Sequence, residues 1–274
     1  MKPYSVIQRH DKIIQIDIMK QQRNLKDSDF NDDYLNINAV DLDLTENIFR
    51  IFKYEYFIKD LIDKKLTLVR PHTWQDPFEN FLLNSQGQMD DGRIVSFDNI
   101  RDEYYCQCWS LKEECDGIWR NYKGENEFAI KAKTTSKKLF NEIYDMNNKV
   151  HNLCYFIGKV DYVSDSEIAD FFKDKIDFNN FQSGLELPLT LLMKRKSFSY
   201  EEEVRIIVYD KTPNSTDLLR INLDLNYIID EIIFDPWIKP DLFDEKRQEL
   251  IDNGFTGKIS KSGLYSKPFF IAKL

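Results

Sequence analysis

The spacing of apolar residues switches between two periods along the chain, and each switch predicts a change between strand and helix. Residues 48–52 (IFRIF) form a short apolar run that is typical of a strand. The apolar residues that follow recur three and four positions apart, the spacing of one helix face, at Tyr54, Phe57, Ile58, Leu61 and Ile62. Residues 65–69 (KLTLV) return to alternation. We therefore predict a strand, a helix and a second strand over residues 48–69.

The same two patterns predict the later elements. Strands are expected where apolar or aromatic residues alternate with polar ones, in segments 103–110, 127–133, 153–163, 203–210, 218–223, 229–238, 255–260 and 267–274. Helices are expected over 115–124, closed by Gly124, and over 137–146, with Ser136 as the N-cap. Most of 165–195 and all of 241–253 are also predicted to be helical.

The order of these elements predicts the fold class. Residues 1–44 are mostly polar, and within them we interpret 12–19 (KIIQIDIM) as a strand and the rest as an N-terminal extension. Residues 45–274 are interpreted as a single domain. Strands and helices do not alternate regularly, and the strands cluster towards the C-terminus. This order predicts an α+β fold with a mixed, mostly antiparallel sheet flanked by helices.

Composition narrows the function. The chain has 274 residues, of which 42% are hydrophobic, enough for a large core. Its net charge of −9 argues against tight, unspecific nucleic-acid binding, although Lys194, Arg195 and Lys196 could form a local basic groove. The first residues show no apolar leader, and no run approaches the roughly 20 apolar residues of a membrane span. We expect a cytoplasmic protein without membrane association.

The cysteines do not form a standard zinc pattern. Cys106 and Cys108 have one residue between them, where zinc sites usually have two or more, and all three histidines lie far away in the sequence. We interpret Cys106, Cys108, Cys115 and Cys154 as reduced thiols of a cytosolic protein. No metal is therefore expected, and no glycine-rich phosphate loop is visible.

Three consecutive acids, residues 201–203 (EEE), enter the strand predicted over 203–210. Strand alternation places Glu201 and Glu203 on one face, together with Arg205, while Val204 and its alternate neighbours face a core. Two carboxylates on one face repel each other unless water or a cation relieves the repulsion. One interpretation is a solvated strand entrance with Arg205 and the basic run 194–196 as neighbours.

Other segments favour a cleft over a solvated entrance. Turns rich in aromatic and acidic residues occur at 73–80 (TWQDPFEN) and 234–238 (FDPWI), and polar and aromatic groups follow a strand at 108–110 (CWS) and 117–122 (GIWRNY). These motifs resemble, in order, those of a bacterial family, the domain of unknown function 2971 proteins. The similarity covers roughly residues 48–265, and "QDPFE" and "YEEEVR" are its most specific parts. Gln75, Trp74 and Trp109 depart from the family's usual residues, and the family name carries no function.

The order of an arginine in a first strand, a strand ending in serine and an E-x-E entering a later strand is also similar to the ADP-ribosyltransferase superfamily. The resemblance implies a split sheet and NAD as the substrate. It implies that Glu203 holds the ribose and that Glu201 orients or deprotonates the acceptor. Arg50 would anchor the pyrophosphate, with Arg70 as the fallback, and Ser110 would fix the ribose or Glu203. Trp119, Tyr122 or Trp109 would stack on a base.

Chemistry suits these assignments, because breaking the nicotinamide–ribose bond develops positive charge that a carboxylate stabilises. The leading hypothesis is an NAD-consuming ADP-ribosyltransferase or NAD glycohydrolase, acting as a bacterial toxin or phage-defence effector on a macromolecular or small-molecule acceptor.

Two alternatives remain open at this point. One is a metal-dependent nuclease or phosphoesterase that uses Asp76, Glu79, Glu201 and Glu203 as ligands of Mg²⁺ or Mn²⁺. The other is a non-catalytic interaction module, such as the partner of an antitoxin or of another component of a defence system.

Overall fold

The computed structural model describes residues 6–76, 78–81, 84–89, 91–97, 101–122, 128–144, 155–174, 189–210 and 215–268. Its main sheet contains β1 (Ala39–Val40), β2 (Asn47–Lys53), β3 (Lys65–Val69), β6 (Tyr104–Ser110), β7 (Ala129–Thr135), β8 (Tyr155–Lys159), β11 (Glu203–Tyr209), β12 (Leu218–Asn222), β13 (Glu231–Phe234) and β14 (Lys258–Lys261). The α-helices are α1 (Val6–Arg23), α2 (Asn31–Ile37), α3 (Tyr54–Asp63), α5 (Asp116–Tyr122), α6 (Ser136–Ile143), α8 (Asp165–Asp174) and α11 (Pro240–Asp252). Short 3₁₀ turns are η1 (Asp27–Phe30), η2 (Pro71–Thr73), η3 (Lys196–Glu201) and η4 (Leu225–Tyr227).

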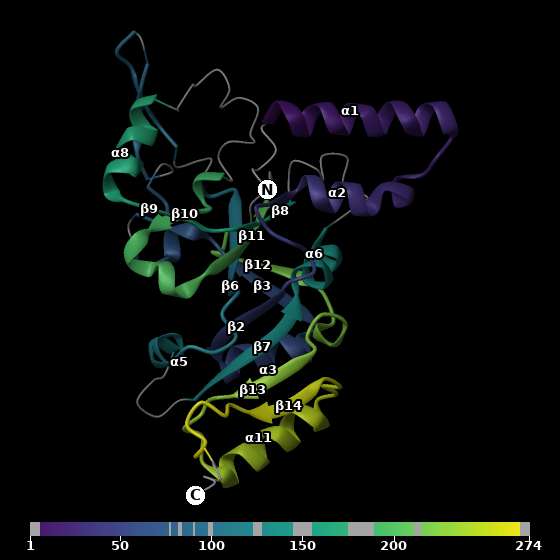
Figure 1. Ribbon diagram of the computed structural model, residues 1–274, viewed down its shortest axis with the longest axis vertical. Helices are drawn as coiled ribbons and strands as arrows, with labels where there is room; N and C mark the ends of the chain where they lie inside the picture. Colours follow the sequence, from purple (N-terminus) through teal and green to yellow (C-terminus); the bar gives the residue numbers. More distant parts are fainter. Residues whose placement is uncertain are drawn as a thin grey trace, which may run out of the picture.

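The strand order confirms a mixed, mostly antiparallel α+β fold. The main path runs β1-β8-β11-β6-β2-β7-β13-β14, and β12 joins through β3. In this sheet β1 pairs with β8 and β14 with β13 in parallel, whereas the other pairings among the described strands are antiparallel. Helices α1 and α2 lie beside one end of the sheet and α11 beside the other (Figure 1).

The sheet is split beside β6. Ser110 at the end of β6 pairs with Phe49 of β2, and Cys106 pairs with Val69 of β3. On this side of β6, no described strand pairs with the residues between these two positions. The side chain of Gln107 instead donates to the carbonyl oxygen of Thr67 at 2.9 Å. β2 and β3 therefore diverge from a common neighbour and leave a gap between them.

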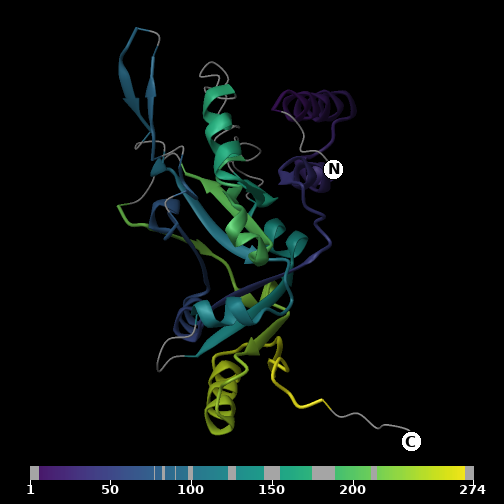
Figure 2. The same ribbon diagram turned by 60° about the vertical axis from the view of Figure 1, so that its left-hand side comes forward.

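Two small sheets lie outside the main one. β9 (Asp161–Val163) pairs in parallel with β10 (Met193–Arg195). β4 (Gln86–Gln88) and β5 (Ile94–Ser96) form an antiparallel hairpin, drawn in blue, that projects from the body (Figure 2).

Alternating residues of β11 face two separate cores, of which the sequence pattern predicted only the one on the Val204 face. Val204, Ile206 and Val208 pack in the larger core with residues of α2, α3, α6 and α11. Ile207, on the other face with Glu203 and Arg205, packs in a second core.

Gly158 of β8 lies opposite Arg205 in register. An added Cβ there would lie 2.5 Å from the side chain of Leu192 and 2.9 Å from that of Val40, so close packing requires glycine.

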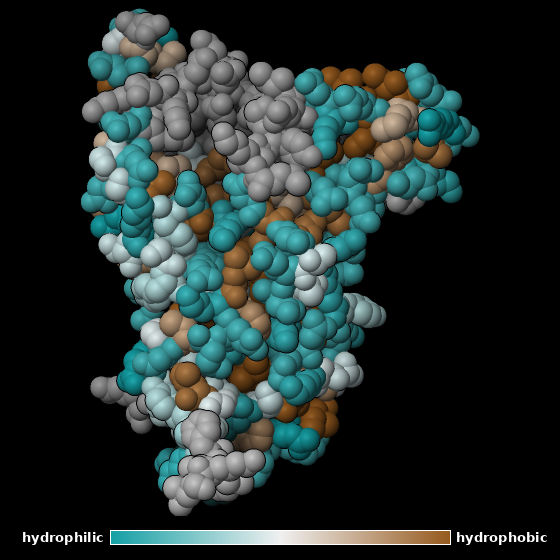
Figure 3. All heavy atoms as spheres, in the orientation of Figure 1, coloured by the Kyte–Doolittle hydropathy of each residue, from teal (hydrophilic) through white to brown (hydrophobic). Residues whose placement is uncertain are grey.

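The N-terminal region differs most from the prediction. Residues 12–19, predicted as a strand, lie in helix α1. Ile16 of this helix packs in the larger core with Tyr34 and Leu35 of α2, so one face of the helix is buried by tertiary contacts that override the strand propensity of isoleucine. Ile14 and Ile18 of this helix are exposed. Figure 3 shows apolar surface over α1.

Several element boundaries also differ. The N-cap of α6 is Thr135, whose hydroxyl accepts a hydrogen bond from the backbone of Lys138 at 3.2 Å, whereas Ser136 is the first helical residue. The long strand predicted over 153–163 is divided into β8 and β9, and residues 193–195 form a strand, not the end of a helix. Gly124, Cys154 and most of the predicted closing strand 267–274 lie outside the described residues. In the described part of the chain, no helix is both long and apolar enough to span a membrane.

Candidate functional site

The acidic triplet forms a turn that sends its side chains in two directions. Glu202 adopts a left-handed conformation (φ 44°) at the end of η3. Its backbone is held from both sides, because its N–H donates to Ser199 and its carbonyl accepts from Leu111. The carboxylate of Glu202 pairs with Lys112 at 2.6 Å. Those of Glu201 and Glu203 both turn to Lys194.

Four buried side chains form a closed ring of alternating charge, the charge ring, made of Glu79, Lys194, Glu203 and Arg205. The ammonium of Lys194 lies 2.8 Å from Oε1 of Glu79 and 3.0 Å from Oε1 of Glu203. The Nη2 of Arg205 lies 2.8 Å from Oε2 of Glu79 and 2.6 Å from Oε2 of Glu203. Each carboxylate therefore gives one oxygen to each cation, and the ring as a whole is neutral.

Burial makes this ring unlike a solvated strand entrance. Glu203 is 9% exposed and Arg205 is 0% exposed. Arg205 also donates to the carbonyl of Leu191 at 2.7 Å, and the ring of Trp74 lies 4.4 Å from its guanidinium carbon. Of the neighbours expected for a solvated entrance, Arg205 and Lys194 do contact Glu203, but in a buried site, while Arg195 and Lys196 pair with other acids. Buried charges need such partners, because an unpaired one is costly to desolvate.

Glu201 is the surplus charge beside the ring. Its Oε2 accepts the third N–H of Lys194 at 2.5 Å. Burial and the neighbouring carboxylate of Glu203 raise the pKa of Glu201 to about 7, against the opposing effect of Lys194. Burial alone would also raise the pKa of Glu203, but Arg205 and Lys194 lower it to about 2. One carboxyl is thus ionised at neutral pH, while the other exchanges its proton there.

The segment that contains "QDPFE" supplies part of this site. Asp76 binds Arg195 at 2.9 Å, and Glu79 closes the charge ring. Trp74, Asp76 and Glu79 therefore all contact residues at or near the acidic triplet. Trp237 of the second turn, "FDPWI", packs instead in a third core with Ile51 and Trp119.

Ser110 lies beside the site but does not contact the Glu203 carboxylate. It is opposite Glu203 in the pairing of β6 with β11. Its hydroxyl donates to the carbonyl oxygen of Glu201 at 2.5 Å and accepts from the backbone of Lys112 at 2.9 Å. The hydroxyl of Tyr162 accepts from the backbone N–H of Glu203 at 2.9 Å. These two hydroxyls fix the backbone that carries the acids.

Arg50 does not share the face of Ser110 and Glu203. Its neighbour Phe49 is the residue that pairs with Ser110, so alternation directs Arg50 to the opposite face. There it lines a cavity of about 20 Å³ with Asp60 and Trp109, beside the split in the sheet. The expectation that Arg50, Ser110 and Glu203 converge in one cleft is wrong in this respect, because adjacent strand residues point to opposite sides.

The guanidinium of Arg50 is nevertheless unpaired among the described residues. It lies 4.8 Å from the ring centre of Phe52 and forms neither a hydrogen bond nor an ion pair with any described group. Burial lowers the pKa of Arg50, and the nearby Tyr122, Cys108 and Asp60 oppose this. By contrast, Arg70 donates to Asp217 and to Tyr105, each at 3.2 Å. Arg50 is the better anion ligand of the two.

Of the three aromatic residues expected to stack on a ligand, only Tyr122 is exposed to solvent. Trp119 is 0% exposed and donates its indole N–H to Glu114. Trp109 is buried and donates to Gln107 at 2.8 Å. Both tryptophans pack in cores, so their rings are not available to a ligand, and the prediction is wrong for them.

Tyr122 lies on α5 and differs from the two tryptophans in its exposure. The residue is 43% exposed. Burial of its hydroxyl end, with Cys108, Glu203 and Glu201 adding and Arg50 opposing, raises its pKa to about 12.

Three of the four acids of the nuclease hypothesis converge, but on a lysine, whereas Asp76 pairs with Arg195. Glu79, Glu201 and Glu203 all contact the ammonium of Lys194, which occupies the position that a metal ion would need. Among the described residues, no group of three or more His, Cys, Asp or Glu side chains is placed to hold a metal ion. Cys106, Cys108 and Cys115 are free thiols, and burial raises the pKa of Cys108 to about 12.

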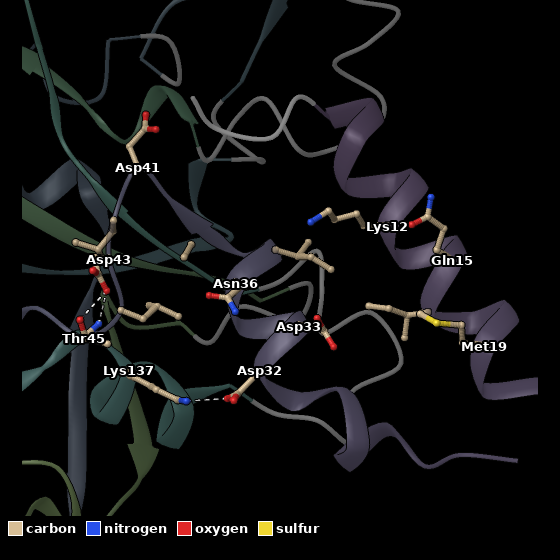
Figure 4. Close-up of a pocket in the computed structure, with 15 residues that line it drawn as sticks. Lys12, Gln15, Met19, Asp32, Asp33, Asn36, Asp41, Asp43, Thr45 and Lys137 are labelled. Carbon is tan, nitrogen blue, oxygen red and sulfur yellow. Dashed lines mark hydrogen bonds and ion pairs between the residues drawn. The ribbon is translucent and has the colours of Figure 1, made fainter. Parts of the chain in front are cut away.

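A larger cavity, of about 820 Å³, lies at the N-terminal end of the fold. It is bounded by α1, α2 and residues 41–45. Asp32, Asp33 and Lys12 are among the residues that line it (Figure 4). Lys137 spans part of it by an ion pair with Asp32 at 2.8 Å. No residue of the charge ring lines this cavity.

The chain matches no known family and shows only a weak structural likeness to solved proteins. No protein-family model matches the chain, and no curated protein was found to be similar, so the resemblance to the domain of unknown function 2971 family stays a prediction. Solved structures of DarT from Thermus sp. 2.9 align with 81% of the chain. The complex with NAD⁺ is 13% identical over 98% of that chain (TM-score 0.35), and the complex with ADP-ribosylated single-stranded DNA is 11% identical over 96% (TM-score 0.36). This likeness is too weak to support an argument about function.

Proposed function

We propose that this chain is an NAD-consuming ADP-ribosyltransferase or NAD glycohydrolase whose acidic groups are Glu203 and Glu201. The observation that supports this most is that the carboxylates of Glu201 and Glu203 meet at the buried ammonium of Lys194. Only Glu203 is also bound by Arg205, so cations lower its pKa against the effect of burial, whereas burial raises the pKa of Glu201. Catalytic sites commonly combine a permanently ionised carboxylate with one that exchanges a proton near neutral pH. The residues of the site carry the proposal, and the weak likeness to DarT does not contribute to it.

Glu203 faces the ribose. When the bond between ribose and nicotinamide breaks, its electron pair leaves with nicotinamide and the ribose becomes cationic. An ionised carboxylate next to the ribose stabilises this charge more in the transition state than in the ground state. Both oxygens of Glu203 are bound to cations, and the contact with Lys194 is the longest of that lysine's three, at 3.0 Å. A ribose hydroxyl would replace this contact.

Glu201 is the base that takes a proton from the acceptor. A nucleophile attacks the cationic ribose carbon, and the proton that it loses passes to the carboxylate of Glu201. A base with a pKa near 7 suits this transfer at neutral pH. Its carboxyl is hydrogen-bonded to Lys194 and to the carboxyl of Glu203, and the incoming group would replace one of these contacts.

Arg50 and Tyr122 complete the binding site across the split in the sheet. Arg50 offers an unpaired, planar set of donors that fits a pyrophosphate. The pKa of Tyr122 responds to the charges of both parts, and we assign its exposed ring to stacking on a base. We assign the phosphates of NAD to Arg50 and its ribose to Glu203.

The expected consequence in a cell is loss of NAD or modification of an acceptor, as in a bacterial toxin or phage-defence effector restrained by an antitoxin. We place this activity in the cytoplasm, where free thiols such as those of Cys106 and Cys108 persist.

Separate substitutions of the two acids test the assignment. With radiolabelled NAD, Glu203→Gln is expected to lower nicotinamide release on the order of 100- to 1,000-fold. Glu201→Gln is expected to retain cleavage, because the bond breaks before the acceptor attacks, and to lose label transfer to protein, RNA or single-stranded DNA. Glu202→Gln is the matched control, because its carboxylate faces Lys112. Wild-type levels of cleavage in folded Glu203→Gln would refute the role of that carboxylate.

A further inference from the structure

The buried site contains one more carboxylate than cations, and the geometry identifies the surplus group. Glu79 and Glu203 each bind both Lys194 and Arg205, so these four form a neutral unit. Glu201 contacts only Lys194 among the cations, and its carboxyl also forms a side-chain hydrogen bond with that of Glu203. Its side chain is also the most exposed of the three acids, at 17%, compared with 12% for Glu203 and 8% for Glu79.

We propose that Lys194 and Glu79 are positioning residues, which hold Glu203 ionised within the charge ring and leave Glu201 as the carboxyl that carries the proton. The chemical use of that proton rests on the proposed function, whereas its location does not. Neither Lys194 nor Glu79 needs to touch a substrate for this role, because each acts through the two acids of the triplet.

Lys194 is held so that it can act only on these acids. Its three N–H donors point to three different carboxylates, at 2.8, 2.5 and 3.0 Å. The residue is buried, and the ring of Phe198 lies 4.7 Å from its ammonium. An ammonium has three donors, so all of them are used. Lys194 therefore fixes the relative positions of Glu79, Glu201 and Glu203.

Glu79 sets the charge balance from a distant part of the chain. It belongs to the turn after η2, while the other groups come from β10, η3 and β11. If Glu79 loses its charge, two cations face two carboxylates, and Glu201 then ionises more readily. If Lys194 loses its charge, one cation faces three carboxylates, and Glu201 holds its proton to higher pH. The two changes must shift the titration of Glu201 in opposite directions.

Other ionisable groups lie near Glu201 and Glu203 on the neighbouring elements. They are Arg195 on β10, Tyr162 on β9, Cys108 on β6, Tyr122 on α5, Asp76 in the turn after η2 and the ion pair of Glu202 with Lys112. Burial raises the pKa of Tyr162, and it raises those of Tyr122 and Cys108 to about 12, so these three stay neutral at physiological pH. Glu201 is therefore the group expected to change charge near neutrality.

Carbon NMR of the full-length protein with isotope-labelled glutamate tests this directly. The Glu201 carboxyl signal is identified by its loss in Glu201→Gln and followed against pH. We expect a midpoint near 7 in the wild type. It should fall by about one pH unit or more in Glu79→Gln and rise by about one or more in Lys194→Met. Asp76→Asn, which removes an acid of the same turn bound to Arg195, should leave it within a few tenths.

The titration midpoints of Glu201 in these proteins either support or overturn the proposal. A wild-type Glu201 midpoint near its ordinary 4.5, or shifts of the same sign in the two variants, would overturn the proposal. Should Lys194→Met fail to fold, the wild type and Glu79→Gln decide it, because an unchanged or raised midpoint in Glu79→Gln also overturns it. The titration needs no NAD. An absence of NAD turnover with the expected midpoints would therefore refute the proposed function alone.

Discussion

Replacing Glu201 by glutamine removes the surplus charge of the buried site and keeps the size of the side chain. The carboxyl titrates near 4.5 in an unfolded chain and near 7 in the folded one. Between these values the folded protein holds a proton that the unfolded chain has already lost. The free energy of unfolding of the wild type therefore decreases as pH rises through this window. Glutamine cannot ionise, so the variant lacks this decrease.

The size of the effect follows from the shift in pKa. Each unit is worth about 1.4 kcal/mol, so a rise from 4.5 to about 7 corresponds to about 3 kcal/mol in total. Part of this loss of unfolding free energy occurs below about pH 5. A further loss of about 2 kcal/mol should occur between about pH 5 and about pH 8. The pKa of Glu203 is lowered to about 2, so its contribution to stability is present above 4.5 and is lost only as pH falls towards 2. It does not change in the measured range.

Urea unfolding at the two pH values gives the difference. Relative to the wild type, Glu201→Gln should gain about 2 kcal/mol on going from the lower to the higher pH. Glu202→Gln is the matched control, because the side chain of Glu202 is 44% exposed and bound to Lys112 at the surface. The reasoning would be refuted if Glu201→Gln and Glu202→Gln showed the same dependence on pH.

Three further predictions follow from single residues. Arg50→Met should weaken NAD binding on the order of tenfold or more, measured by calorimetry. It should not lower the free energy of unfolding in urea, because Arg50 has no ion pair among the described residues. Gly158→Ala should destabilise the protein by about 1–3 kcal/mol, since the added methyl would meet Val40 and Leu192; the urea midpoint measures this. Iodoacetamide should modify Cys108 slowly in the native protein and rapidly after unfolding, because burial raises its pKa to about 12; mass spectrometry follows both rates.

Local patterns were enough to predict the body of the fold. The run IFRIF, the helical spacing from Tyr54 to Ile62 and the alternation around Val204 all appear as predicted, because each segment has one face that packs in a core. The helix over residues 12–19 was missed, because isoleucines favour strands locally and only packing against α2 decides the matter.

The candidate site could be predicted only in part. The acidic triplet and "QDPFE" both contribute to it, because charged residues next to apolar strands need partners. That Lys194 would join Glu79 and Glu203 depends on long-range contacts, and the sequence offers no spacing rule for them. Alternation could have shown that Arg50 and Ser110 leave the sheet on opposite faces only if the pairing of Phe49 with Ser110 had been known.

The most direct test of the central claim is nicotinamide release from NAD by the purified wild type and by Glu203→Gln, with equal folding verified by circular dichroism. We predict release by the wild type and a loss on the order of 100-fold or more in the variant. No release by the wild type in the presence of protein, RNA and DNA acceptors, or equal release by both proteins, would contradict the assignment of this buried carboxylate to NAD cleavage.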